Sequence, residues 1–150
     1  MRLLFVCTGN ICRSPLAEGY ARMRLAVEGL GWEVDSAGTG AWHVGEEPDP
    51  RAKRVAADRG YEIGDLRGRQ VVVGDFYAFD HIVALDQGHL SQLRRLKPRD
   101  SRIEPTLLLG WADGPDLDVQ DPYYDNEMAF EGAADVIEAG VDSLIEALRA

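Results

Sequence analysis

Short apolar runs alternate along this chain with segments whose apolar residues recur at helical spacing. The runs, together with the short stretch 33–36, predict strands at residues 2–6, 33–36, 81–85 and 103–109. Helical spacing predicts helices at 14–29, 51–59 and 75–79, a helix through Leu90, Leu93 and Leu96 that ends at Pro98, and a long last helix capped by Asp125. Residues 39–50 and 111–124 are predicted as loops, and 66–73 fits a loop, a turn or a strand.

Strands that alternate with helices form parallel β-α-β units joined by right-handed crossovers. We therefore predict an α/β fold with a four-stranded parallel sheet and helices on both faces. At 150 residues and 45% hydrophobic composition, the chain is long enough for one core and short for two. Residues 1–150 are expected to form a single domain.

The composition limits the location and the partners. No apolar run approaches the roughly 20 residues of a membrane-spanning helix, and the N-terminus leads into a strand without a signal-peptide pattern. Two cysteines five positions apart suit a reducing compartment better than a disulfide scaffold. We expect a soluble cytoplasmic protein. Its net charge of −10 argues against nucleic acid and anionic membranes as partners, so an anion site must be locally positive.

The segment between the first strand and the first helix has the features of such an anion site. A tight loop before a helix start turns unpaired backbone N–H groups towards one point, where the helix dipole is positive. Gly9 and Asn10 tolerate the positive φ angles of such a loop. Ser14 is predicted to cap the helix, and Pro15 to occupy its first position.

A thiol and a guanidinium lie six positions apart in this segment. Cys7 and Arg13 are expected to face one bound oxyanion, with the loop N–H groups and Arg13 stabilising the nucleophilic thiolate of Cys7. Taken alone, a cysteine and an arginine at this spacing are more often a buried strand-end cysteine and a solvated arginine at a helix start. The strand, the Gly-Asn pair and the helix start around them favour the anion site.

Two motifs carry a resemblance that covers essentially the whole chain. Val6-Cys7-Thr8-Gly9-Asn10-Ile11-Cys12-Arg13-Ser14-Pro15 and the later Asp121-Pro122-Tyr123-Tyr124 resemble the signatures of the low-molecular-weight protein tyrosine phosphatases. The resemblance implies a flavodoxin-like strand order 2-1-3-4, with the loop after the first strand at the topological switch point.

The resemblance also implies a two-step hydrolysis of phosphotyrosine without metal or cofactor. Cys7 attacks phosphorus, Arg13 binds the equatorial oxygens, and Asp121 protonates the leaving oxygen and then activates water. Ser14 is expected to donate a hydrogen bond to the Cys7 sulfur, although a helix cap explains the serine equally well.

Asp113, Asp116 and Asp118 lack the pattern of a calcium loop and are interpreted as a solvated acidic loop.

The remaining site residues follow from the same resemblance. Phosphate or sulfate is expected to bind the loop residues Thr8, Gly9, Asn10, Ile11, Cys12 and Ser14, and the substrate ring to lie between Trp42 and the pair Tyr123 and Tyr124. Cys12 is either a redox partner that protects an oxidised Cys7 or a small buried residue. Ile11 stands where arginine phosphatases of the family tend to carry threonine, which favours phosphotyrosine.

One position departs from the family. Leu66 occupies the place of a histidine that would brace Asn10 and Glu18, so Glu18 is expected to lack that partner. The three histidines are scattered and form no metal set with the cysteines.

Other functions stay open. The chain could be an arginine phosphatase of the same family, a thioredoxin-coupled arsenate reductase or a non-catalytic anion-binding protein. The reductase needs a downstream cysteine pair, and no cysteine follows Cys12. The expected partners are phosphotyrosine-containing proteins or aryl phosphates, and the protein is expected to be a monomer.

Overall fold

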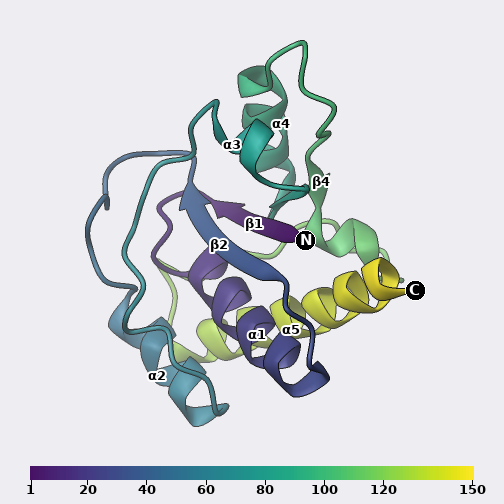
Figure 1. The fold of residues 1–150 in the computed structure, drawn as a ribbon. Coiled ribbons are helices and arrows are strands. Elements are labelled where there is room, and N and C mark those ends of the chain that lie inside the picture. Colours follow the sequence, from purple (N-terminus) through teal and green to yellow (C-terminus); the bar gives the residue numbers. More distant parts are fainter.

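Four parallel strands form one sheet in the order β2-β1-β3-β4, as predicted (Figure 1). The computed structural model describes residues 1–150. The strands are β1 (Arg2–Cys7), β2 (Glu33–Gly38), β3 (His81–Ala84) and β4 (Thr106–Leu107). Because β1 pairs with β2 on one side and β3 on the other, its carboxyl end lies where the direction of strand succession reverses, which is where α/β sheets bind ligands.

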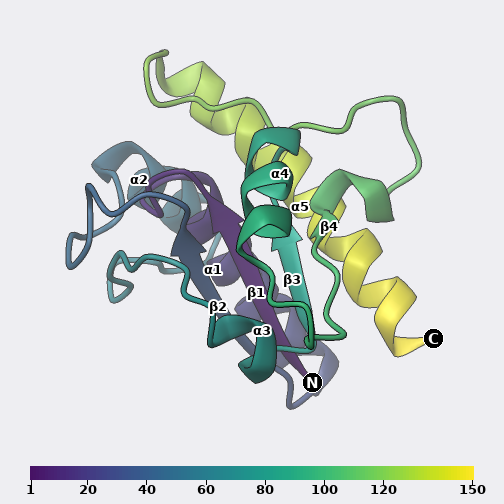
Figure 2. The same cartoon turned by 90° about the horizontal axis from the view of Figure 1, so that it is seen from above.

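Helices cover both faces of the sheet. They are α1 (Arg13–Glu28), α2 (Pro50–Asp58), α3 (Asp75–Ala78), α4 (Gln87–Leu96) and α5 (Glu127–Arg149), with a 3-10 helix, η1 (Leu108–Trp111). Figure 1 shows α1, α2 and α5 on one face and α3 and α4 on the other, and Figure 2 shows α4 lying across the sheet from α5. No helix combines the length with the apolar composition that crossing a membrane requires.

The two layers of helices explain the continuous apolar run of β1. Leu3 and Phe5 belong to the core beneath α1 and α5, whereas Leu4 and Val6 belong to the core beneath α3 and α4. Alternate side chains of a strand point to opposite faces, so a strand that is covered on both faces is apolar at every position.

The fourth strand is shorter than predicted. It comprises Thr106–Leu107 instead of residues 103–109, and η1 begins directly afterwards at Leu108. The strand lies at the edge of the sheet and pairs only with β3. Pro105 has no N–H to donate, which ends the possible pairing on the N-terminal side.

Two predicted helix caps are also wrong. Helix α1 begins at Arg13 after Cys12, so Ser14 and Pro15 lie inside the first turn. The Ser14 hydroxyl is engaged within the phosphate-loop region and does not cap the helix. At α5, the N-cap is Asn126, whose side chain accepts a hydrogen bond from Ala129 N at 3.1 Å, and not Asp125. Residues 66–73 form a loop that touches the sheet through one isolated bridge, Gly38 to Gln70.

Candidate active site

The loop between β1 and α1, residues 8–12, closes one side of a small pocket at the carboxyl end of the sheet together with its flanking residues Cys7 and Arg13. The pocket holds about 110 Å³, and residues of both predicted motifs line it, although Asn10 and Ser14 do not. Its lining residues are Cys7, Thr8, Gly9, Ile11, Cys12, Arg13, His43, Asp121, Tyr123 and Tyr124. The two segments, more than 100 residues apart in sequence, meet because β1 and the loop after η1 end at the same edge of the sheet.

Cys7 is buried at the end of β1, and its sulfur faces a hydroxyl. The Cys7 Sγ lies 3.0 Å from Ser14 Oγ. Asn10 Nδ2 donates to that same Ser14 oxygen at 2.9 Å, so Ser14 keeps its own proton available for a donor bond. When Cys7 is a thiolate, this proton can be donated to its sulfur.

Asn10 holds the loop in shape. It is the one non-glycine residue with positive φ, at 59°, and this left-handed conformation suits asparagine. Its Nδ2 also donates to Ser36 Oγ at 2.9 Å, and its Oδ1 accepts from Arg69 N at 3.0 Å. Gly9, in contrast, does not have the positive φ that its residue type allows.

Glu18 has partners despite the leucine at position 66. The buried Glu18 carboxylate accepts from Ser36 Oγ at 2.7 Å and from Arg22 at 2.5 Å. Burial raises its pKa, and these bonds oppose that shift. Ser36 therefore links Glu18 to Asn10, while Leu66 packs against the apolar core.

Arg13 is buried and held in place from several sides. Its Nη1 donates to Asp86 Oδ2 and to the Val119 carbonyl, both at 2.8 Å. Its Nη2 lies 3.7 Å from Asp121 Oδ2. The hydrogen bonds and ion pair offset the cost of burying the charge, and they fix the guanidinium plane at the pocket.

His89, which the sequence pattern did not single out, completes the surroundings of Arg13. The buried imidazole Nε2 lies 2.7 Å from Thr8 Oγ1 and 3.4 Å from Arg13 Nη2. Its Nδ1 is 3.2 Å from Asp86 Oδ1, although out of line for a hydrogen bond. Burial lowers the pKa of His89 to about 4, with Arg13 adding to the shift and Asp86 opposing it. The ring is neutral at physiological pH, and a proton on Nδ1 would leave Nε2 to accept from Thr8.

The second motif forms the opposite side of the pocket. Asp121 is 43% exposed, and its Oδ1 accepts from Tyr123 N at 3.1 Å. Tyr123 is half-buried, whereas Tyr124 is 90% exposed and meets the Tyr123 ring edge-to-face. Trp42 does not line this pocket; its ring lies against Gly40, and the next residue, His43, takes a place in the lining.

The ion pair between the partly exposed Arg51 and the buried Asp49 links the phosphate loop to the second motif. Asp49 N donates to the Ile11 carbonyl at 2.8 Å, and the Asp49 carboxylate binds Arg51 through both of its oxygens. Arg51 in turn donates to the carbonyls of Tyr123 and Asp125, at 2.9 and 3.1 Å. The position of the Asp121 segment is therefore tied to that of the phosphate loop.

Comparison with known proteins gives the family. Residues 2–150 match the low molecular weight phosphotyrosine protein phosphatase family. The chain belongs to this family. It is 48% identical over 154 residues to a low molecular weight protein-tyrosine-phosphatase of Streptomyces coelicolor, covering 99% of this chain and 93% of that protein. The crystal structure of a protein tyrosine phosphatase from Entamoeba histolytica with Hepes in the active site superposes with a TM-score of 0.94 at 36% identity, over 99% of this chain and 97% of that one.

A structure with a different stated specificity is equally similar in fold. The Drosophila arginine phosphatase superposes with a TM-score of 0.95 at 30% identity, covering 100% of this chain and 99% of that chain. The fold of a low-molecular-weight phosphatase alone therefore does not select between phosphotyrosine and phosphoarginine.

Both cysteines of this phosphatase are free thiols. Cys12 is buried, and burial together with the nearby Asp49 carboxylate raises its pKa far above the ordinary range, so it is a protonated thiol at neutral pH. No three His, Cys, Asp or Glu side chains are grouped so that they could hold a metal ion.

Sequence reasoning missed Asp86, His89, His43 and Ser36. The first two had a usable signal, because Asp86 and His89 follow a buried strand and begin a helix, so they lie at the same sheet edge as Cys7. Ser36 and His43 had no such local signal.

Proposed function

We propose that this protein is a metal-independent phosphatase that hydrolyses phosphotyrosine monoesters through a phosphocysteine intermediate. The observation that carries the proposal is the pair Cys7 and Arg13 in one buried pocket, with Ser14 Oγ 3.0 Å from the sulfur. An anion-binding protein without turnover would not need a thiol and a carboxyl group on opposite sides of the anion.

In the first step, the Cys7 thiolate attacks phosphorus, and an S–P bond forms as the P–O bond to tyrosine breaks. Arg13 and the loop N–H groups bind the equatorial oxygens, where negative charge has to be stabilised. Asp121 gives its proton to the departing tyrosine oxygen. Asp86 and the Val119 carbonyl keep Arg13 oriented before substrate arrives, which lowers the cost of reorganisation.

In the second step, the Asp121 carboxylate takes a proton from water, and the water oxygen attacks phosphorus. The S–P bond breaks, and its electron pair returns to Cys7 as a thiolate. The Ser14 hydroxyl donates to this sulfur as it leaves. The products are inorganic phosphate and the regenerated enzyme with a protonated Asp121.

Phosphotyrosine is the substrate that the pocket suits best. A flat phenyl ring would lie against Tyr123 and Tyr124, with the apolar Ile11 on the loop. Phosphoarginine is the second candidate, because the Drosophila arginine phosphatase shares the fold so closely. Matched phosphotyrosine and phosphoarginine peptides separate the two, and a higher kcat/KM for phosphoarginine would overturn the preference assigned to Ile11.

Steady-state turnover of para-nitrophenyl phosphate at mildly acidic pH, with a chelator present, tests the reaction itself. Cys7→Ser should abolish turnover, because a serine hydroxyl is not ionised at this pH. Asp121→Asn should slow phenyl phosphate by about 10²- to 10⁴-fold and para-nitrophenyl phosphate much less, since the better leaving group needs no proton. Turnover by Cys7→Ser at the wild-type rate would refute the nucleophile, and an equal loss on both substrates would refute the acid.

We also propose that the enzyme acts as a cytoplasmic monomer. Its nucleophile must stay reduced, which the cytoplasm favours.

A further inference from the structure

A second groove lies beside the phosphate pocket, on the side of α4. It holds about 430 Å³ and shares Thr8 with the pocket; Trp42 and Arg95 lie among its lining residues. Trp42 is 74% exposed, an unusual position for a side chain of this size. The groove is open to solvent and continues from the place where a phosphorylated side chain would enter.

Arg95 brings an unpaired positive charge to this groove. Its side chain is exposed and makes no ion pair with any carboxylate, unlike Lys97, which lies 3.5 Å from Glu104. In a helix, residues three apart lie on the same side, so Gln92 and Arg95 follow His89, which contacts Thr8 at 2.7 Å. The six residues from His89 to Arg95 rise about 9 Å along the axis of α4. Side chains of a helix lean towards its N-terminus, so the Arg95 side chain leans towards His89.

Charge differs between the two sides of the pocket. The larger groove on the other side, of about 510 Å³, is lined by Asp116, Asp118 and Asp125 together with Asp121. In a protein of net charge −10, an acidic segment is repelled from that side. The α4 groove offers the unpaired Arg95, and its one lining carboxylate, Asp86, is paired with Arg13. The arrangement orients a bound chain by its charge.

We propose that this groove binds an acidic residue of the phosphoprotein substrate, with its carboxylate on Arg95 and the adjoining substrate segment against Trp42. An extended chain advances about 3.3 Å per residue, so the rise of about 9 Å from His89 to Arg95 corresponds to two or three residues, and we expect the acidic residue two or three positions from the phosphotyrosine. The inference rests on the proposed phosphotyrosine hydrolysis, and it extends that function by naming acidic flanking sequence as the preferred substrate class.

The test compares phosphotyrosine peptides that carry Glu or Gln at two or three positions on either side of the phosphotyrosine. The wild type should show a kcat/KM about three- to tenfold higher for the Glu peptide on one side, and the advantage should shrink with salt. Arg95→Gln should remove the higher kcat/KM of the Glu peptide. Arg95→Glu should instead favour the peptide that carries Lys at the same position. Because the ratio is taken within each variant, a change in the amount of folded enzyme cancels.

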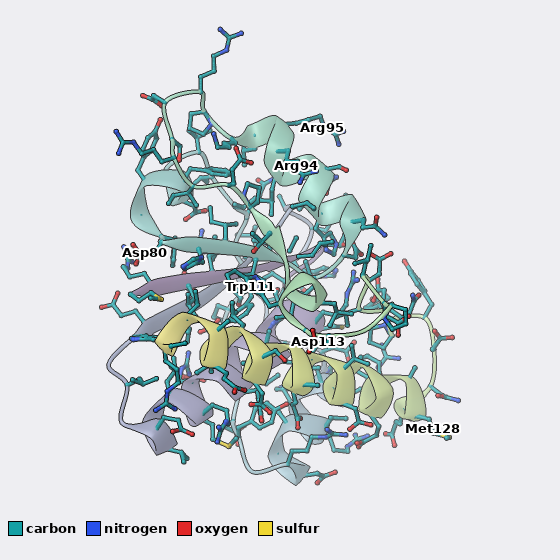
Figure 3. All side chains as sticks on the ribbon, turned by 90° about the vertical axis from the view of Figure 1, so that its right-hand side faces the viewer. Asp80, Arg94, Arg95, Trp111, Asp113 and Met128 are labelled. Atoms are coloured by element: carbon teal, nitrogen blue, oxygen red, sulfur yellow. The ribbon has the colours of Figure 1, made fainter.

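Arg94→Gln is the matched control. Arg94 is the neighbouring exposed arginine of α4, but it does not line the groove; Figure 3 labels both arginines on this helix. It should keep the Glu preference. The inference would be overturned if Arg94→Gln lost the Glu preference as fully as Arg95→Gln, or if the wild type showed the same kcat/KM for Glu and Gln peptides at all four positions. In either case, turnover of para-nitrophenyl phosphate would leave the proposed function standing. Absence of that turnover would instead refute the proposed function.

Discussion

The Nε2 atom of His89 lies 2.7 Å from the Thr8 hydroxyl, and the imidazole is buried between the phosphate loop and Asp86. This contact joins the start of α4 to the loop that follows β1. In the tautomer that carries its proton on Nδ1, the neutral imidazole accepts from Thr8, and it lies beside Arg13 without competing for an anion. The geometry assigns His89 the role of positioning Thr8 and Arg13.

Replacement of His89 tests that role. In His89→Gln, the amide oxygen can still accept a hydrogen bond from Thr8, whereas His89→Leu offers only apolar atoms. We expect His89→Leu to lower kcat/KM by about tenfold, equivalent to about 1.4 kcal/mol of transition-state binding. His89→Gln should recover most of the loss. If both variants kept the thermal stability of the wild type and lost kcat/KM to the same extent, a hydrogen-bonding role of His89 would be contradicted.

His89 also predicts a dependence of stability on pH. Its pKa falls from 6.5 in the unfolded chain to about 4 in the folded protein, so between these values the unfolded state binds more protons. The stabilisation is present above pH 6.5 and is lost as pH falls towards 4. It amounts to about 3 kcal/mol. Urea unfolding of the wild type and His89→Gln from pH 7 to pH 4 measures the difference, and parallel curves would contradict the prediction.

Ser14→Ala should slow the second chemical step more than the first. Without the Ser14 hydroxyl, the sulfur leaves phosphorus without a hydrogen bond, and the phosphocysteine accumulates. We expect kcat to fall by about tenfold or more, with a burst of para-nitrophenol near one equivalent in rapid-quench measurements. Ser143→Ala on α5 is the control and should behave as the wild type. A slow variant without a burst would mean that Ser14 acts before the intermediate forms.

Gly38 at the end of β2 should tolerate no side chain. A Cβ there would lie 2.7 Å from the Thr8 carbonyl oxygen, which belongs to the backbone of the phosphate loop. Gly38→Ala should lower the free energy of unfolding by about 1 to 3 kcal/mol and reduce kcat/KM, because the loop must shift. Gly31→Ala, where a Cβ meets nothing within 4 Å, provides the control. Unchanged stability and activity in Gly38→Ala would show that the loop adapts.

The two thiols should differ in reactivity. Both thiols are buried, but the raised pKa of Cys12 keeps it protonated, so iodoacetamide at neutral pH should modify Cys7 and leave Cys12 intact. Mass spectrometry of the digested protein identifies the site. Phosphate should protect Cys7 by occupying the loop, and Cys7→Ser should take up almost no label. Rapid labelling of Cys12 in that variant would contradict the assignment.

The sequence by itself determined the alternation of strands and helices, and its two motifs indicated which segments carry the chemistry. Cys7 to Arg13 could be recognised because these residues act within a single strand-loop-helix unit, whose backbone conformation depends on local residue types. The Asp121 segment was recognisable by its motif, although its distance from Cys7 is set by the sheet.

Only the tertiary structure decided which distant side chains complete the site. Ser36 reaches Asn10 across 26 residues, and His89 reaches Thr8 across 81, through contacts that no local pattern encodes. Trp42 lies against Gly40 and lines the neighbouring groove, not the phosphate pocket, because its direction depends on the loop around it. Strand β4 is short because it lies at the sheet edge and pairs only with β3. The Ser14 hydroxyl contacts the Cys7 thiol and does not cap the helix. The contacts of Ser36 and His89 are long-range, whereas those of Trp42 with Gly40 and of Ser14 with Cys7 join residues close in sequence. In all of them, side-chain direction and hydrogen-bond partners are set by packing and not by local propensity.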